Sequence, residues 1–294
     1  MTHRTLLLSV LSGFSLLIVF PTLATVIHLL AQKGEYSHIF LIPAISSALI
    51  YRERDKVFAN VQTSFVRGMS LVASSLILSW AGTAYGGFLS PNDKLSVSFL
   101  TLVIFWIGCF VICYGVRAAR AALFPLLFLL LMVPLPDIII SNVVHFLQKG
   151  SAEVAYFLFG TAGVPVLQKG LVFSLPGIEI EVASECSGIR SSIALFITSL
   201  VLGHWYLNET WKKLLLTILV VPIVVLRNGL RIFTLATLGI YVNPSYLHGP
   251  LHHRGGIVFY VLSLLVLLPL LKMMQSSGQR PHCAPASSIG FHGN

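Results

Sequence analysis

A group of reactive side chains lies at the start of a long apolar segment, in the stretch EVASECSGIRSS at residues 181–192. Cys186 supplies a thiol, and a thiolate can attack a peptide carbonyl to form a thioester. A nearby arginine would lower the pKa of that thiol or hold the oxyanion, and a histidine would protonate the leaving amine. Both types recur later, in RNGLRI at 227–232 and LHGPLHHRGG at 247–256. The three stretches together suit acyl transfer.

Each of these residues also has an ordinary structural explanation. A cysteine at a helix start is more often inert than catalytic, and an arginine such as Arg231 can be an anchor that reaches the membrane surface. Adjacent histidines in a glycine-rich loop can simply be polar loop residues. The chain has four cysteines, which form no CxxC pair and have no zinc-like spacing with histidine. We therefore expect neither a metal ion nor a cofactor, and we interpret Cys109 and Cys113 as small packing residues.

The composition places the chain in a membrane. Of its 294 residues 56% are hydrophobic and 10% are charged, whereas a soluble domain carries about 25% charged residues. So much apolar surface requires lipid as the solvent, which predicts an all-α multi-pass membrane protein. The net charge of +9 is typical of cytoplasmic loops. We expect no nucleic-acid binding, because no basic soluble segment with interleaved aromatic residues is present.

Apolar runs of spanning length predict about eight transmembrane helices. We expect them at residues 6–31, 37–51, 68–89, 96–115, 119–136, 187–206, 212–241 and 256–274. We interpret the first run as a retained span, because no clear small-residue cleavage site follows it. An even number of crossings puts both termini on one side. The positive-inside rule makes that side cytoplasmic, because the links on it carry Arg52, Arg54, Lys56, Arg67, Arg117, Arg120, Lys212 and Lys213.

Two segments between the fifth and sixth spans differ from the rest. Residues 138–164 are apolar but carry polar side chains three or four residues apart, which predicts an amphipathic helix on the outer surface. A re-entrant hairpin is the alternative. Residues 165–184 alternate with period two between glycines and prolines, and predict a small β-hairpin leading into Cys186. We expect one integral membrane domain over 1–275 and a disordered tail over 276–294.

The predicted topology brings the three reactive stretches to the outer face. Cys186 begins a span that runs inward. Arg231 lies nineteen residues beyond Lys212 on a span that runs outward, which is about 28 Å at 1.5 Å per residue. The loop at 247–256 precedes the last span. An ionisable group at membrane depth is costly and indicates a functional site.

Five stretches in this order resemble the exosortase/archaeosortase family of multi-pass membrane proteins. They are YSHIFLIPAISSALIYRER at 36–54, FPLLFLLLMVPLP at 124–136, EIEVASECSGIRSS at 179–192, RNGLRI at 227–232 and LHHRGGIVFY at 251–260. The cysteine stretch is the most specific of them, and the resemblance extends from about residue 35 to 270.

The resemblance implies a cysteine transpeptidase or protease with Cys186 as nucleophile and Arg231 as the arginine of an Asn-x-x-Arg motif. Asn228 shares a helix face with Arg231 and would orient it. The histidine is best matched by His252, and His253 and His248 remain alternatives. Arg227 is a lesser rival of Arg231. Further supporting residues are Glu185, Ser187, Gly188, Arg190 and His38.

The resemblance also implies partners and a location. Substrates would be exported proteins with a C-terminal sorting signal, consisting of a short motif, one transmembrane helix and a basic tail. Cleavage would occur at the outer (periplasmic) face of the inner membrane, among membrane lipids, with a link to polysaccharide-export machinery. The cleavage motif and the acyl acceptor, an amine or water, stay open. The alternatives are a transporter whose polar residues line a path, and an accessory protein of polysaccharide export without chemistry.

Overall fold

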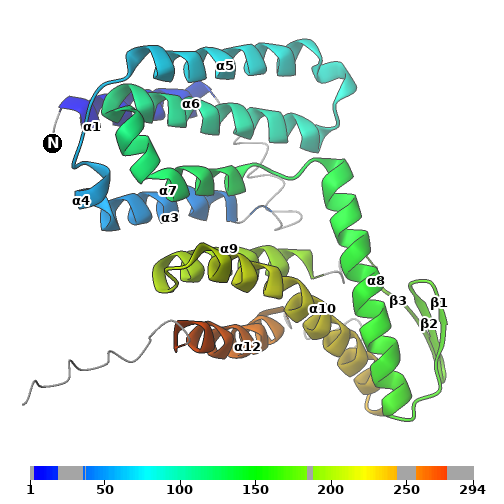
Figure 1. Cartoon of the computed structure of the whole chain (residues 1–294). Coiled ribbons are helices and arrows are strands. Elements are labelled where there is room, and N and C mark those ends of the chain that lie inside the picture. The colour runs from blue at the N-terminus through cyan, green and yellow to red at the C-terminus, as the bar shows by residue number, and fades with distance from the viewer. Residues whose placement is uncertain (1–2, 19–35, 37, 184–187, 244–255, 277–294) are drawn as a thin grey trace, which may run out of the picture. The chain divides into compact units, whose positions relative to one another are not determined.

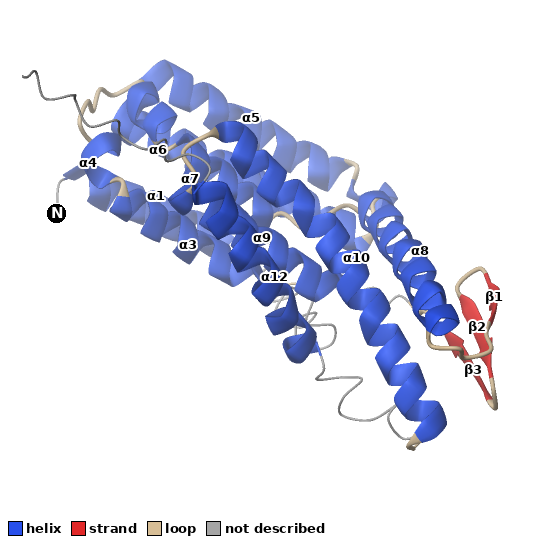
Figure 2. Cartoon of the chain, turned by 60° about the horizontal axis from the view of Figure 1, so that its bottom comes forward, coloured by secondary structure: helices blue, strands red, loops and turns tan. Residues whose placement is uncertain are grey.

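The computed structural model describes residues 3–18, 36, 38–183, 188–243 and 256–276 (Figure 1). Helices dominate these residues, and a small antiparallel sheet accompanies them (Figure 2). The predicted class, a helical protein with a small β element, is confirmed. By its internal contacts the chain divides into two compact units, residues 1–143 and 144–294. The single membrane domain over 1–275 stays a prediction, and so does the disordered tail, which lies outside the described residues from 277 onward.

Four described helices are long and apolar enough to cross a membrane. They are α5 (Phe65–Ala84), α6 (Pro91–Ala121), α10 (Thr210–Tyr241) and α12 (Gly256–Ser276). A fifth results if residues 123–132 and the helix α8 (Asp137–Thr161) are taken as one broken span. The described residues thus support four or five spans, and the predicted count of eight is not confirmed.

The remaining predicted spans correspond to shorter helices. The run 37–51 is the 15-residue helix α3 (His38–Arg52), and 187–206 is the 18-residue helix α9 (Ile189–Tyr206). The run 6–31 contains α1 (His3–Ile18) and then passes outside the described residues. Short pieces complete the first unit, namely α4 (Arg54–Val57), η1 (Gly86–Phe88), α7 (Leu123–Phe128) and η2 (Leu129–Met132).

The predicted span at 119–136 is interrupted for a local reason. Gly115, with φ 86°, takes a left-handed conformation and breaks α6 before the segment begins. Val133, with ψ 119°, is extended, as expected for a residue that precedes a proline. Between these breaks lie the end of α6, up to Ala121, and then α7 and η2, which together cover residues 123–132.

In the first unit α5 and α6 pack side by side (Figures 1 and 2). A Cβ atom added to Gly108 would lie 2.9 Å from Cγ2 of Val72 and 3.1 Å from the carbonyl oxygen of Gly68. Small residues therefore let the two backbones approach closely, as is common between membrane helices. Cys109 and Cys113 are buried in α6 with free thiols, in agreement with their interpretation as packing residues.

In the second unit α9, α10 and α12 contact one another, and α8 packs between α10 and the sheet. The hydrophobic cluster between α8, α10 and the sheet includes aromatic rings in contact. The rings of Phe159 in α8 and Phe173 in the sheet have centroids 5.8 Å apart, and Phe159 also lies 5.2 Å from Phe233 of α10. One hydrophobic cluster thus fixes α8 and the sheet against the helix that carries the arginines.

The sheet has the strand order β1–β2–β3, with β1 (Leu167–Lys169), β2 (Val172–Leu175) and β3 (Ile178–Glu181) all antiparallel. The predicted hairpin over 165–184 is therefore correct in kind but has three strands. Gly170 and Gly177, with φ 64° and 78°, form the two tight turns, which require left-handed backbone. β3 ends at Glu181, five residues before Cys186 in the sequence.

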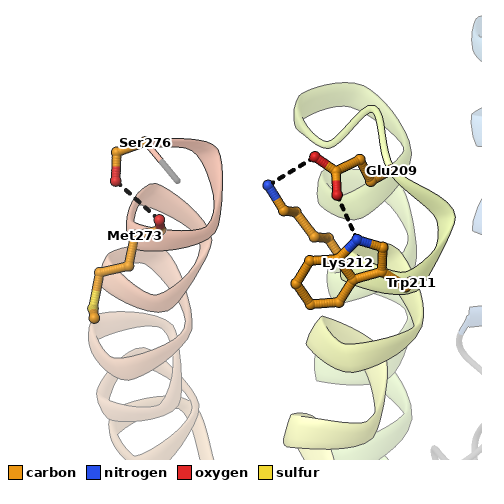
Figure 3. A network of polar contacts seen from close by, with 5 residues as sticks. All are labelled: Glu209, Trp211, Lys212, Met273 and Ser276. Atoms are coloured by element: carbon orange, nitrogen blue, oxygen red, sulfur yellow. Dashed lines mark hydrogen bonds and ion pairs between the residues drawn. The ribbon is translucent and has the colours of Figure 1, made fainter. Parts of the chain in front are cut away.

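A polar group surrounds the start of α10 (Figure 3). Lys212 is 5% exposed, and its Nζ lies 3.1 Å from Oε1 of Glu209. The indole of Trp211 also donates to Glu209. The hydrogen bond from Lys212 lowers the pKa of Glu209, and that from Trp211 acts in the same direction. In α12, also drawn in Figure 3, the Ser276 hydroxyl donates to the carbonyl of Met273.

Candidate functional site

The predicted site residues fall into two groups. Gly188, Arg190, Asn228, Arg231 and His38 belong to the described residues. Glu185, Cys186, Ser187, His248, His252 and His253 lie outside them, so their roles stay predictions.

Gly188 forms the start of α9 and adopts a conformation that favours glycine. It is the N-cap residue, with φ 70° and ψ 18°. The hydroxyls of Ser191 and Ser192 donate to its carbonyl at 2.9 and 2.8 Å. Only glycine adopts this left-handed geometry without a steric penalty. The chain can therefore turn from the cysteine stretch into α9 at this residue.

Gly188 also packs directly on the arginine stretch of α10. A Cβ atom at this position would lie 2.9 Å from Nη2 of Arg227 and 3.2 Å from Oδ1 of Asn228. Gly188, which follows Cys186 by two residues, thus lies against the first two residues of RNGLRI. Two of the three reactive stretches, 39 residues apart in sequence at Gly188 and Arg227, meet in the second unit.

Asn228 is fully buried and joins α10 to α8. Its Nδ2 donates to Oγ of Ser151 at 3.1 Å. Next to it, a Cβ atom on Gly229 would lie 3.0 Å from the carbonyl oxygen of Ser151, so the two helix backbones are in close contact. Asn228 therefore helps to hold α10 against α8. This contact is separate from the predicted role of Asn228, which is to orient Arg231.

Ser151 and Gln148 contribute to the site although the sequence analysis did not select them. Gln148 is buried, and its Nε2 donates to the carbonyl oxygen of Val182 at 2.7 Å. This bond holds the residue that follows β3, four positions before Cys186 in the sequence. Gln148 and Ser151 lie three residues apart on α8 and therefore share one helix face. This pair of polar residues on one face is the sequence feature that could have identified them.

Arg227 and Arg231 lie one turn apart on α10. Arg227 is 5% exposed, whereas Arg231 is half-buried, and the two guanidinium groups are close enough to repel each other. α10 runs unbroken from Thr210, so Arg231 lies about 28 Å along the helix from Lys212. This is close to the thickness of the apolar core of a bilayer.

Arg190 and His38 are the remaining described candidates. Arg190 is exposed in the first turn of α9. His38 begins α3 in the first unit. The supporting roles of both stay predictions.

Two shallow hollows of about 570 and 660 Å³ lie beside α8. Glu153, Tyr156 and Val166 line both of them. Their described linings contain no predicted site residue. The candidate site is therefore defined by the contact between α9 and α10 and not by these hollows.

Replacing Gly188 with alanine is expected to destabilise the protein. A left-handed conformation costs a non-glycine residue about 1–2 kcal/mol, and the new methyl would press on Arg227. We expect a lower thermal unfolding temperature in detergent for Gly188→Ala. The matched control is Gly203→Ala inside α9, where a Cβ atom would make only ordinary contacts of 3.7 Å or more and should be tolerated. Equal unfolding temperatures for Gly188→Ala and the wild type would contradict the observed geometry.

Comparison with known proteins gives one result. A family model described as "Transmembrane exosortase (Exosortase_EpsH)" matches residues 30–269, which is more than half of the chain and includes all three reactive stretches. No curated protein and no solved structure matches the chain.

Proposed function

The chain belongs to the transmembrane exosortase family, and from this premise we propose that it is a membrane-embedded cysteine transpeptidase or protease. Its substrates are exported proteins with a C-terminal sorting signal, made of a short motif, one transmembrane helix and a basic tail. Cleavage proceeds through a thioester between the substrate and Cys186. The acceptor that releases the product is an amine or water.

The observation that carries this proposal is the packing of Gly188 on Arg227 and Asn228. Cys186 precedes Gly188 by two residues, and two peptide units span at most about 7 Å between Cα atoms. This covalent limit holds for any conformation of the intervening residues. It limits the Cα atom of Cys186 to within about 7 Å of that of Gly188, and Gly188 packs on Arg227. A cation near a thiol favours the thiolate, which is the nucleophilic form.

The proposed reaction has two stages. The thiolate of Cys186 adds to the scissile carbonyl carbon, and the carbonyl π electrons move to the oxygen. When that oxyanion collapses, the C–N bond breaks and the amine leaves with a proton from His252. The resulting thioester is then attacked by the acceptor amine or by water, which gives a proton to His252, and the thiolate is released as the C–S bond breaks. Arg231 stabilises negative charge in this sequence, on the thiolate or on the oxyanion.

We further propose that the site lies on the outer face of the inner membrane, with both termini in the cytoplasm. The start of α10 supports this arrangement. Lys212 and Trp211 gather there, and these residue types favour a membrane–water interface. Arg231 is about one membrane thickness further along the same helix. The transmembrane helix of the substrate would dock laterally among the spans through close packing and a few polar contacts.

A processing assay tests the proposed function. The chain is co-expressed with an exported protein that bears the three-part signal and a C-terminal tag. We expect the tag to be lost only when the chain is present. A substrate whose signal lacks the basic tail serves as the matched control and should keep its tag. If the signal-bearing substrate stays at full length and keeps its tag when the chain is present, the proposal is contradicted. That result would favour a transporter or an accessory protein.

A further inference from the structure

Two buried polar side chains lie on one face of α8, and neither is among the predicted site residues. Gln148 is 9% exposed and Ser151 is fully buried. The two residues are three positions apart, so they share a helix face and are separated by about 4.5 Å along the helix axis. Burial of a polar side chain is costly unless a hydrogen bond compensates for it. Each of these side chains makes such a bond, and the two partners belong to different segments of the second unit.

Gln148 binds the chain just after the sheet. Its Nε2 donates to the carbonyl oxygen of Val182 at 2.7 Å. The backbone N–H of Val182 in turn donates to the carbonyl oxygen of Leu171 at 2.9 Å. Val182 is 1% exposed and follows the last residue of β3. Its backbone is therefore held by the sheet through the N–H and by α8 through the carbonyl, four positions before Cys186 in the sequence.

Ser151 binds α10 next to the arginine stretch. Its Oγ accepts a hydrogen bond from Nδ2 of the fully buried Asn228 at 3.1 Å. A Cβ atom on Gly229 would lie 3.0 Å from the carbonyl oxygen of Ser151. A Cβ atom on Gly150 would lie 3.1 Å from Cγ1 of Val225. These close approaches fix the register of α8 on α10, because a shift of either helix would press larger side chains against the neighbouring backbone.

We propose that Gln148 and Ser151 are positioning residues for the proposed reaction. α8 holds Val182 through one of them and Asn228 through the other. It thereby sets the separation between the segment that leads to the cysteine stretch and the helix that carries the arginines. This inference rests on the proposed function. In this role neither residue contacts the substrate, and both act through the residues that they bind. A misplacement of about 1 Å can lower a rate about 100-fold, so loss of either contact slows the chemical step.

A double-mutant cycle tests this inference with the purified chain and a signal-bearing substrate. Gln148→Met removes the amide donor at similar volume, and Ser151→Ala removes the hydroxyl. We expect each variant to lower kcat about 10-fold and to keep KM within about 2-fold of the wild type, because the contacts with the substrate stay intact. The unfolding temperature in detergent is measured in parallel, so that kcat refers to folded protein.

The double variant gives the decisive result. A fixed separation between two segments requires both contacts, so release of the first contact already removes the constraint. We therefore expect Gln148→Met/Ser151→Ala to lose about 10-fold in kcat, as each single variant does, whereas independent effects would multiply to about 100-fold. A multiplied loss in the double variant would overturn the inference. Wild-type kcat in either single variant, with only the unfolding temperature or KM changed, would also overturn it.

Ser141→Ala and Asn142→Leu are the matched controls on the same helix. Ser141 is exposed, and its hydroxyl donates to the carbonyl of Ile138 within α8. Asn142 is also exposed. Both variants should keep wild-type kcat, and a loss equal to that of Ser151→Ala would show that α8 responds to any change, against the inference. If Gln148→Met does not accumulate in the membrane, Gln148→Asn replaces it, because its amide is one methylene shorter and does not reach the carbonyl of Val182.

A failure of the inference is distinguishable from a failure of the proposed function. If Cys186→Ala still processes the substrate, the thioester reaction itself is wrong, and the positioning role falls with it. If Cys186→Ala is inactive while Gln148→Met and Ser151→Ala keep wild-type kcat, the enzyme reaction stands and only the positioning role of α8 is wrong.

Discussion

Replacing Cys186 with alanine is expected to abolish processing of the co-expressed substrate while the protein remains inserted in the membrane. Without the sulfur no thioester forms, and loss of a catalytic nucleophile reduces turnover by about 10⁴-fold or more. The measurement is the fraction of substrate that loses its C-terminal tag, with the amount of membrane-inserted protein determined in parallel.

Cys283→Ala provides the matched control for this variant. Cys283 lies in the polar tail, and its replacement should leave processing unchanged. Normal processing by Cys186→Ala would refute the mechanism. The transporter and the accessory protein would then be the remaining hypotheses for the function of the chain. Loss of processing in both variants would show that the assay responds to any cysteine change and that Cys186 has no special role.

The second large effect is expected for Arg231→Lys. Arg231 is half-buried on α10, one turn from the buried Arg227. A lysine keeps the positive charge but is a point charge with a different donor geometry, so it does not replace a guanidinium that binds in a fixed orientation. We expect processing to fall about 100-fold, with no rescue by the retained charge.

Arg120→Lys is the corresponding control, because Arg120 is exposed in the last turn of α6. It should process within about 2-fold of the wild type, as surface substitutions usually have small effects. Near-wild-type processing by Arg231→Lys would show that a generic positive charge suffices at this position, and the specific role of its guanidinium would be wrong.

The sequence pattern predicted secondary structure well where neighbouring residues alone determine it. The amphipathic helix expected at 138–164 is α8 at Asp137–Thr161, because polar and apolar residues repeat with helical spacing along it. The sheet at 165–184 was predicted in place but with one strand too few. Its strands have only three or four residues, so alternation within each of them is a weak signal.

The pattern was less informative where a contact between distant segments decides the outcome. Gln148 was counted with the polar residues of 138–164, yet it is buried and donates to the carbonyl of Val182. Its burial depends on the chain returning from the sheet, which helical periodicity does not encode. Hydropathy likewise predicted a span at 119–136, although Gly115 kinks α6 just before that segment.

The candidate site shows the same contrast. The reactive stretches at 181–192 and 227–232 were recognised from residue types, and Gly188 joins them through its contact with Arg227. The resemblance ranked Arg231 first because it is the arginine of the Asn-x-x-Arg motif, and Arg227 stayed a lesser rival because it shares a helix face with Arg231. The burial of Arg227 follows from the packing of α9 and α8 on α10, so it became visible only in three dimensions.

The most direct test of the proposed chemistry is to capture the acyl-enzyme itself. A signal-bearing substrate is incubated with the purified protein, the reaction is stopped with acid, and the peptide containing Cys186 is examined by mass spectrometry. The account predicts an adduct whose mass equals the substrate up to the cleavage site, joined to Cys186 and released by hydroxylamine, since hydroxylamine cleaves thioesters. A processed substrate without any adduct on Cys186, or with the adduct on another residue, would contradict it.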